Sequence, residues 1–298
     1  MIRDTTRRTR KDLINSANSV DLLLPLQALT TFDRNGLDLV LEFTALGMPT
    51  WTSQIEEWVF ELTKRNMKTL YEETAKKGFR DWRWSDSKKR EELFAPESRF
   101  IIAREREQTK GEAAGLLQDI PLSKDSESGE NKNTSETTNT CGTSTTTDTN
   151  TSSTTATSTT SNAAATTGHR QFNGRPLAFI SFRLVSEGPL EVLYVYELQL
   201  EPETQRKGLG RHLMTTAELA ARKAGFQAVM LTVLKKNSGA LDFYTQKMKY
   251  EIDNDSPSRN GDMRAPYEIL SKIVDRKGYA ERMRLVEEGL IDEDYKKV

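Results

Sequence analysis

"QRKGLGRHLMTTAELAARKAG", residues 205–225, is the stretch that decides the fold. Two glycines and three basic residues occupy a short turn that leads directly into a helix. Glycines at a helix start leave backbone N–H groups unpaired and unobstructed, and the helix dipole adds partial positive charge at the same end. The basic side chains strengthen that charge. The stretch therefore predicts an anion site, with a phosphate or pyrophosphate as its ligand.

The spacing of this turn narrows the class of phosphate ligand. It is not G-x-G-x-x-G, and no acidic residue follows a second strand at the distance that a dinucleotide fold requires. No G-K-[ST] sequence is present, which excludes a nucleotide-hydrolysing P-loop. The turn fits Q/R-x-x-G-x-G/A instead, with the residues Gln205, Arg206, Lys207, Gly208, Leu209 and Gly210.

The elements around the turn predict a mixed α/β sheet. Consecutive strands favour antiparallel pairing before the turn, and a strand-helix-strand unit favours parallel pairing across it. "QAVMLTVLK", residues 227–235, is a continuous apolar run typical of a buried strand. The first expected strand lies in 32–46, after an Asn-Gly turn. The other expected strands are 98–105, 175–185, 191–200, 227–235 and the edge strands "YEID" and "PYEILSKI". The expected helices are 52–78, a short one within 81–94, 208–224 and 237–248.

Composition excludes several functional classes. The net charge is −1, so no basic field favours nucleic acid as a direct partner. One cysteine, Cys141, rules out a disulfide within the chain and fits a reducing compartment. No apolar run has the length of a membrane span, and the basic start is not followed by the apolar segment of a signal peptide. We therefore expect a soluble protein of the cytoplasm and nucleus, without a membrane partner.

A low-complexity tract interrupts the ordered sequence. From about 123 to 167 it is nearly all Ser, Thr, Asn, Asp and Glu, and such a segment has almost nothing to bury. It lies between the expected strands 98–105 and 175–185. Because the entropy of closing a loop grows slowly with its length, a hairpin can carry this tract as a long disordered insertion.

The turn resembles the acetyl-CoA pyrophosphate loop of the GCN5-related N-acetyltransferase (GNAT) superfamily. The resemblance extends to Asn-x-x-Ala-x-x-Phe-Tyr at 237–244. "FDRNGLDL", "KKREE", "EVLYVYELQLE", "VMLTVLKKNSGA" and "YEIDNDSPS" are further similar to the NatD family, the N-alpha-acetyltransferases of core histones four and two-A. The match spans roughly 30–105 and 170–272.

This resemblance implies a GNAT fold, with a mixed, mostly antiparallel central sheet flanked by helices. The acetyltransferase domain would span 26–272, interrupted by the insert 107–170, after a polar lead at 1–25 and before a charged tail at 273–298. It also implies a monomer that uses acetyl-CoA to acetylate the N-terminal serine of histone tails. Two alternatives remain open: a GNAT enzyme acting on lysine side chains or a small amine, and a non-catalytic module that binds acyl-CoA or histone tails.

The strand "LYVYELQL" carries the expected catalytic group. By the resemblance, Glu197 is the general base, acting through water, and Tyr196 belongs to the catalytic site. Strict alternation would place Tyr194, Tyr196 and Leu198 on one face and Glu197 on the other, where it could equally be a solvent-facing carboxylate. In GNAT sheets this strand carries a bulge, which changes that alternation.

The resemblance also assigns a substrate pocket. Tyr194 would line it, Trp84 would cover the peptide N-terminus while Trp82 packs, and Tyr267 would close the groove. A substrate beginning Ser-Gly-Arg-Gly needs carboxylates for its arginine. Ungapped alignment puts Val185 where one acid is expected and Glu187 where the other is, and a shift of one or two residues would let Glu187 or Glu191 serve.

The remaining expectations concern the cofactor. Backbone N–H groups near Leu198 or Leu200 would polarise the thioester carbonyl. Asn237 would contact the cofactor or cap its own helix, and both roles are compatible. Tyr244 would protonate the leaving thiolate or pack in the core. Without a Cys/His cluster in the sequence, no metal is expected.

Overall fold

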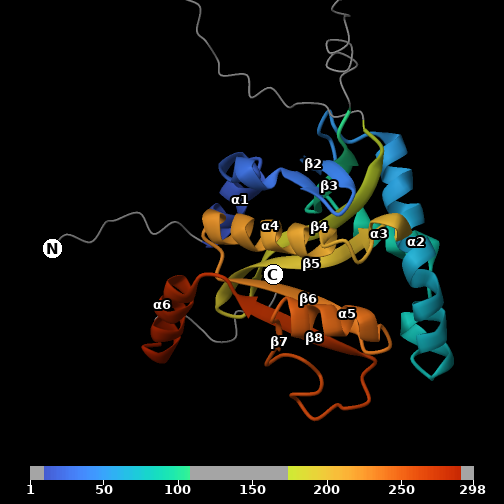
Figure 1. Ribbon diagram of the computed structural model, residues 1–298. Helices are drawn as coiled ribbons and strands as arrows, with labels where there is room; N and C mark the ends of the chain where they lie inside the picture. Colours follow the sequence, from blue (N-terminus) through green and yellow to red (C-terminus); the bar gives the residue numbers. More distant parts are fainter. Residues whose placement is uncertain (1–9, 108–173, 290–298) are drawn as a thin grey trace, which may run out of the picture. The chain divides into compact units, whose positions relative to one another are not determined.

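The computed structural model describes residues 10–107 and 174–289. Most of the predicted insert 107–170, including Cys141, lies outside the described residues, as do the first part of the predicted lead and the end of the predicted tail. What is described forms a single sheet with helices on both faces (Figure 1).

The sheet has eight strands in the order β1-β2-β3-β4-β5-β6-β8-β7. Every neighbouring pair is antiparallel except β5 and β6, which run parallel. The mixed, mostly antiparallel sheet predicted from the sequence is therefore confirmed. The strands are β1 Thr31–Arg34, β2 Leu37–Ala45, β3 Arg99–Glu105, β4 Pro176–Glu187, β5 Leu190–Leu200, β6 Ala228–Leu234, β7 Glu251–Ile252 and β8 Tyr267–Ile273.

The helices divide between the two faces of the sheet. On one face α1, η1 and α4 bury Ala17, Leu26 and Leu213. On the other face α2 and α3 bury Leu62 and Leu93. The helical segments are α1 Arg10–Asn18, η1 Leu24–Leu29, α2 Ser53–Lys76, η2 Arg80–Trp82, α3 Asp86–Leu93, η3 Pro202–Thr204, α4 Leu209–Ala224, α5 Ser238–Asp242, the π-helical turn η4 Phe243–Lys247 and α6 Arg276–Glu287.

One expectation about strands was incomplete and another was wrong. The Asn-Gly turn within 32–46 is present, because Asn35 and Gly36 take positive φ angles of 55° and 73°, and the strand after it is β2. The residues before the turn form a further strand, β1, so the stretch is a hairpin with the two-residue turn that hairpins favour. The strand "PYEILSKI" is not an edge: β8 lies between β6 and the two-residue β7. Within the described residues, no helix combines the length and apolar character needed to cross a membrane.

The predicted hairpin on either side of the insert is confirmed. β3 and β4 pair antiparallel, from Arg99 opposite Phe182 to Arg104 opposite Pro176. The backbone N–H of Glu105 also donates to the Arg175 carbonyl at 3.0 Å. The points at which the chain leaves and re-enters the described part therefore lie on adjacent strands.

The predicted bulge in β5 is present. Ser181 pairs with Glu197 and the next residue, Phe182, pairs with Val195. Tyr196 is therefore an extra residue on β5, and the bulge reverses the alternation of side chains after it.

β5 and β6 pair over only part of their length. Their parallel register runs from Val192 opposite Ala228 to Val195 opposite Leu231. β5 then continues to Leu200 without pairing to β6. The backbone of β5 after the bulge is therefore available on its β6 side, at the position where the sequence predicts the reacting groups.

Candidate active site

The predicted anion loop lies between η3 and α4, with two left-handed residues. Arg206 has a φ of 61° and Gly208, the N-cap of α4, has a φ of 90°. No side chain caps this helix, so the N–H groups of its first turn have no side-chain acceptor. A residue with a Cβ is disfavoured at a φ of 90°, which explains the glycine at 208. The loop thus has the uncapped N–H groups that an anion requires.

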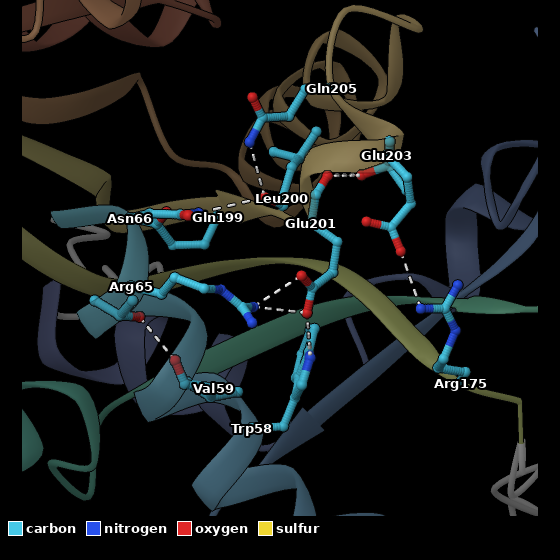
Figure 2. A network of polar contacts seen from close by, with 12 residues as sticks. Trp58, Val59, Arg65, Asn66, Arg175, Gln199, Leu200, Glu201, Glu203 and Gln205 are labelled. Atoms are coloured by element: carbon cyan, nitrogen blue, oxygen red, sulfur yellow. Dashed lines mark hydrogen bonds and ion pairs between the residues drawn. The ribbon is translucent and has the colours of Figure 1, made fainter.

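The loop is held from both ends. The side-chain amide of Gln205 donates to the Leu200 carbonyl at 3.1 Å (Figure 2). Asn35, at the tip of the β1–β2 hairpin, donates to the Lys207 carbonyl at 2.8 Å. The Lys207 carbonyl and the Gly208 N–H belong to one planar trans peptide and point in opposite directions. Asn35 therefore also fixes the direction in which the Gly208 N–H points.

The bulge brings the chemically active side chains of β5 to one face. After the bulge, Glu197 and Gln199 lie on the face of the sheet that α2 and α3 cover, which is also the face of Tyr194 and Tyr196. Leu198 and Leu200 lie on the opposite face, where they pack against the cluster that α4 covers. Strict alternation, which separated Glu197 from Tyr194 and Tyr196, is therefore wrong here, and the bulge that the family resemblance implied accounts for the difference.

Glu197 is a buried carboxylate, with 6% of its surface exposed. Its Oε1 accepts from the Lys89 ammonium at 3.2 Å and its Oε2 accepts from the Gln199 amide at 2.7 Å. Burial raises the pKa of Glu197 above its usual value, against the opposing effects of Lys89 and Gln199. The solvent-facing alternative for this carboxylate is therefore wrong, and its proton affinity is higher than that of an exposed glutamate.

The cation beside Glu197 is itself buried. Lys89 of α3 contacts the Glu92 carboxylate at 2.7 Å and the Tyr71 hydroxyl at 3.1 Å. Burial acts to lower the pKa of Lys89, but the charges of Glu197 and its other partners outweigh it and the pKa is raised. Burial also raises the pKa of Tyr71 to about 12. At neutral pH the pair is thus an ammonium beside a neutral phenol.

A chain of amides links the carboxylate to the anion loop. Asn66 of α2 donates to Gln199 Oε1 at 2.9 Å, and through the same nitrogen to the Leu200 carbonyl at 3.3 Å. Figure 2 shows Gln205 reaching the same carbonyl. Next to it, Glu201 is held by Arg65 and by the Trp58 indole at 3.1 Å. The end of β5 is therefore fixed to α2 by side chains.

Two tyrosines form a wall beside the carboxylate. The rings of Tyr194 and Tyr196 lie 5.5 Å apart, and the Arg183 guanidinium lies 4.1 Å from the centre of the Tyr196 ring. The Tyr194 hydroxyl contacts the Thr232 hydroxyl at 2.6 Å. Burial raises the pKa of Tyr194 to about 12, and the negative charge of Glu187 adds to the shift. Glu187 therefore acts electrostatically on Tyr194, and its contact with a substrate stays a prediction.

The two predicted tryptophans differ in how deeply they are buried. Trp84 is buried in the α2–α3 cluster, where its indole donates to Asp86 at 2.6 Å and its ring meets Tyr71 edge-on at 5.5 Å. Trp82 is half-buried, and its ring lies 5.2 Å from that of Tyr267. Trp82 packs as expected, since its ring also lies 5.9 Å from that of Tyr71, and Trp84 is the more deeply buried of the two. A contact of Trp84 with the substrate stays a prediction.

The last two predicted residues lie after β6. Asn237 caps α5, since its side-chain oxygen accepts from the Ala240 N–H at 3.2 Å. Tyr244 is buried in η4, with its ring 6.0 Å from Tyr250. Burial raises the pKa of Tyr244, and the charge of Glu197 raises it further. Tyr244 is therefore a neutral phenol at neutral pH, close enough to Glu197 to feel its charge.

Sequence reasoning missed the residues that hold the site together. Lys89, Asn66 and Gln199 contact or support Glu197, and Asn35 supports the loop. Lys89 and Asn35 lie in stretches that resemble the NatD family, yet nothing local distinguishes either from a surface residue. Among the described residues no three His, Cys, Asp or Glu side chains form a metal site.

A family comparison agrees with this geometry. The model of the Acetyltransferase (GNAT) family matches residues 142–250. The described part of that match contains β4, the bulged β5, the anion loop with α4, and β6. Over these residues, which are about a third of the chain, the sequence is similar to the GNAT acetyltransferase family. Its mostly antiparallel sheet, with one parallel pair at the site and helices on both faces, is the GNAT fold.

Solved structures of several acetyltransferases are similar to parts or most of this chain. Nourseothricin acetyltransferase is 24% identical, over 34% of this chain and 60% of that one, with a TM-score of 0.28. The PaiA N-acetyltransferase from Thermoplasma acidophilum, solved with coenzyme A, is 12% identical over 78% and 98%, with a TM-score of 0.38. Arabidopsis thaliana Naa50, solved with the bisubstrate analogue CoA-Ac-MVNAL, is 21% identical over 34% and 68%, with a TM-score of 0.28. The chain thus spans less than two thirds of the nourseothricin enzyme.

A cavity of about 230 Å³ lies elsewhere on the described part of the chain. It lies between α1, the segment after it and the end of α4, where Leu13, Val20 and Ala220 line it. None of the predicted site residues lines this cavity. It is therefore separate from the anion loop and the Glu197 carboxylate.

Proposed function

We propose that this GNAT acetyltransferase transfers the acetyl group of acetyl-CoA to the free N-terminal amine of a protein. Its substrates are core histones four and two-A, in the manner of the NatD family, in the cytoplasm and nucleus. The observation that carries the proposal is the bulge in β5. It brings Glu197 and the two tyrosines to one face, directly before the anion loop and at the point where β5 stops pairing with β6.

The residues of the loop fit the coenzyme. The N–H groups of the uncapped α4 and the left-handed Gly208 suit a pyrophosphate, and Arg206 and Lys207 bring positive charge. When bound, acetyl-CoA supplies an activated acyl group on a thioester. The unpaired edge of β5 near Leu198 and Leu200 offers main-chain donors for the acyl oxygen.

Glu197 serves as the base in this reaction. A chain-terminal amine has a pKa of about 8, so most of it is protonated at neutral pH and must lose a proton before it can attack. The raised pKa of the Glu197 carboxylate suits it to accept that proton, directly or through water. The neutral Tyr244 hydroxyl holds the proton that the departing sulfur requires. The nitrogen loses a second proton as the amide forms, and this proton restores the Tyr244 hydroxyl. The proton taken by Glu197 passes to solvent when the product leaves.

The surroundings of the tyrosine wall support a basic peptide as substrate. Tyr194, Tyr196 and Tyr267 offer an aromatic enclosure for the chain end. Glu187, close to Tyr194, offers a carboxylate to the arginine of Ser-Gly-Arg-Gly. A narrow enclosure suits a free chain end better than a lysine side chain, which would need an open groove.

The test is an acetylation assay with Ser-Gly-Arg-Gly peptides whose N-terminal amine is free or blocked. We expect mass spectrometry to find one acetyl group on the free peptide and none on a blocked peptide that contains lysine. Acetylation of the blocked peptide on lysine would favour the lysine-acetylating alternative. Heat of acetyl-CoA binding in calorimetry, without transfer to any peptide or small amine, would favour a binding module.

A further inference from the structure

Lys89 is a buried cation that the reaction described above does not use. Only 4% of its side chain is exposed, although it lies on α3, where only Leu93 is also buried. Lysine is almost never buried to this degree unless its charge is paired. Its position directly against the proposed base therefore calls for a role.

The ammonium of Lys89 has no spare donor. Its three N–H bonds match three acceptors: Glu197 at 3.2 Å, Glu92 at 2.7 Å and the Tyr71 hydroxyl at 3.1 Å. The same nitrogen lies 4.9 Å from the centre of the Tyr71 ring. These contacts come from α2, α3 and β5. They hold the charge in one place relative to Glu197.

The second oxygen of the Glu197 carboxylate is held from the other side. Gln199 donates to it at 2.7 Å, and the Gln199 carbonyl oxygen in turn accepts from Asn66 at 2.9 Å. Because Asn66 fixes which end of the Gln199 amide faces Glu197, the amide presents its donor there. With one donor on each oxygen, the plane of the carboxylate is set.

We propose that Lys89 is a positioning residue that keeps the Glu197 carboxylate ionised and correctly oriented for the incoming amine, with the Gln199–Asn66 amide pair as its counterpart. The proposal rests on the assignment of Glu197 as the base. Only an ionised carboxylate can take a proton, and burial opposes ionisation.

The magnitudes favour this role. Full burial raises the pKa of a carboxyl group by up to about 3–5 units, whereas one close opposite charge lowers it by about 1–3 units. The other charged or titratable groups that act on Glu197 are Glu92, Tyr71 and Tyr244. Glu92 is negative and the two tyrosines are neutral at neutral pH, so none of them can replace the cation. Without Lys89, Glu197 would be protonated over much of the neutral range.

The decisive experiment is the pH profile of kcat/KM for Lys89→Met, with the exposed neighbour Lys88→Met as the matched control. Loss of the cation raises the pKa of Glu197, so the base is protonated up to a higher pH. The acidic limb of the profile should move up by about 1–3 pH units, with activity recovering toward pH 9. At each pH, kcat/KM of the variant is divided by kcat/KM of the wild type, because this ratio cancels the titration of the peptide amine. Lys89→Arg should restore part of the wild-type profile, and Lys88→Met should match the wild type.

Other results overturn the proposal. A loss by the same factor at every pH would mean that Lys89 only supports the structure, and an unchanged profile would mean that it does not act on the base. Glu197→Gln separates the two proposals: if that variant keeps wild-type kcat/KM, the assignment of the base fails, whatever Lys89 does.

A second variant covers the case in which Lys89→Met does not fold. Gln199→Met removes the other donor to the Glu197 carboxylate while keeping the size of the side chain. Its acidic limb should move in the same direction by a smaller amount, and no movement would overturn the proposal. Thermal unfolding of each variant shows that the comparison is made on folded protein.

Discussion

The anion loop and the Glu197 pocket are adjacent parts of one site, but they are built differently. The loop is six consecutive residues whose binding groups belong to the backbone. The pocket is made by side chains far apart in the chain: Lys89 and Glu197 are 108 residues apart, and Asn66 and Gln199 are 133 apart. The loop therefore depends on the conformation of one turn, whereas the pocket depends on the packing of several elements.

This difference determines which property of the enzyme a substitution in each part should change. The loop should respond to changes in backbone conformation and lose affinity for the coenzyme. The pocket should respond to changes in charge and lose rate or change its pH dependence. Because the two parts meet at the Leu200 carbonyl, the separation can be tested from both sides.

The largest effect should come from Glu197→Gln. The amide keeps the size of the side chain but is not basic, so we expect kcat/KM to fall by about 10²–10⁴-fold, the usual contribution of a general base. Calorimetry should give an unchanged dissociation constant for acetyl-CoA, since the loop is unaltered. If affinity falls along with the rate, the two parts of the site are not separate.

The sequence predicted the part that is local. The loop, its place before a helix and the buried strand β6 follow from consecutive residues. The family resemblance added Glu197 and the bulge. That the bulge would bring Glu197 to the side of Tyr196 needed the register against β4.

The supporting side chains could not be predicted. Lys89 has the charged neighbours of an ordinary surface lysine, and only the packing of α3 against β5 buries it. Trp82 and Trp84 are two residues apart in an irregular segment, so no periodicity indicates which of the two is more deeply buried. The burial of these side chains depends on tertiary contacts, and the pattern of neighbouring residues in the sequence does not reveal it.

The next effect in size should come from Gly208→Ala. At a φ of 90° an alanine is strained, so we expect the free energy of unfolding to fall by about 1–2 kcal/mol. Relief of that strain would rotate the peptides of the loop, so the dissociation constant for coenzyme A should rise by about tenfold, the equivalent of about 1.4 kcal/mol. Denaturant unfolding and calorimetry measure the two quantities.

Gly210→Ala is the matched control for this variant. A Cβ at Gly210 would lie 3.8 Å from Leu200 and Phe243, an ordinary contact distance, and the residue is already helical. We expect its stability to be unchanged or higher, because alanine is the better helix former by about 0.5–1 kcal/mol. Equal losses of affinity in both variants would contradict a conformational explanation for Gly208.

A smaller loss of affinity should follow Asn35→Gly. Glycine tolerates the φ of 55° but removes the hydrogen bond to the Lys207 carbonyl, whose net worth is about 0.5–1.5 kcal/mol. The dissociation constant for coenzyme A should therefore rise by about two- to tenfold, with the pH profile unchanged. Asn260→Ala, which loses a comparable contact to the Asn254 carbonyl in the β7–β8 loop, should leave the affinity at the wild-type value. A shift in the acidic limb for Asn35→Gly would show that the loop and the pocket are coupled.

The smallest effect, and the sharpest test of the comparison, should come from Asn66→Ala. Asn66 contacts both parts, through Gln199 on the pocket side and the Leu200 carbonyl on the loop side. The shorter contact is to Gln199, at 2.9 Å against 3.3 Å, and Gln205 still holds the carbonyl when Asn66 is gone. We therefore expect kcat/KM to fall by about two- to fivefold near neutral pH, consistent with the loss of one hydrogen bond acting through another residue. The affinity for coenzyme A should be unchanged, and Lys68→Ala, exposed on the same helix, should change neither quantity. If Asn66→Ala instead weakens coenzyme binding and leaves the rate intact, the amide chain belongs to the loop, and Gln199 presents its donor to Glu197 without help from α2.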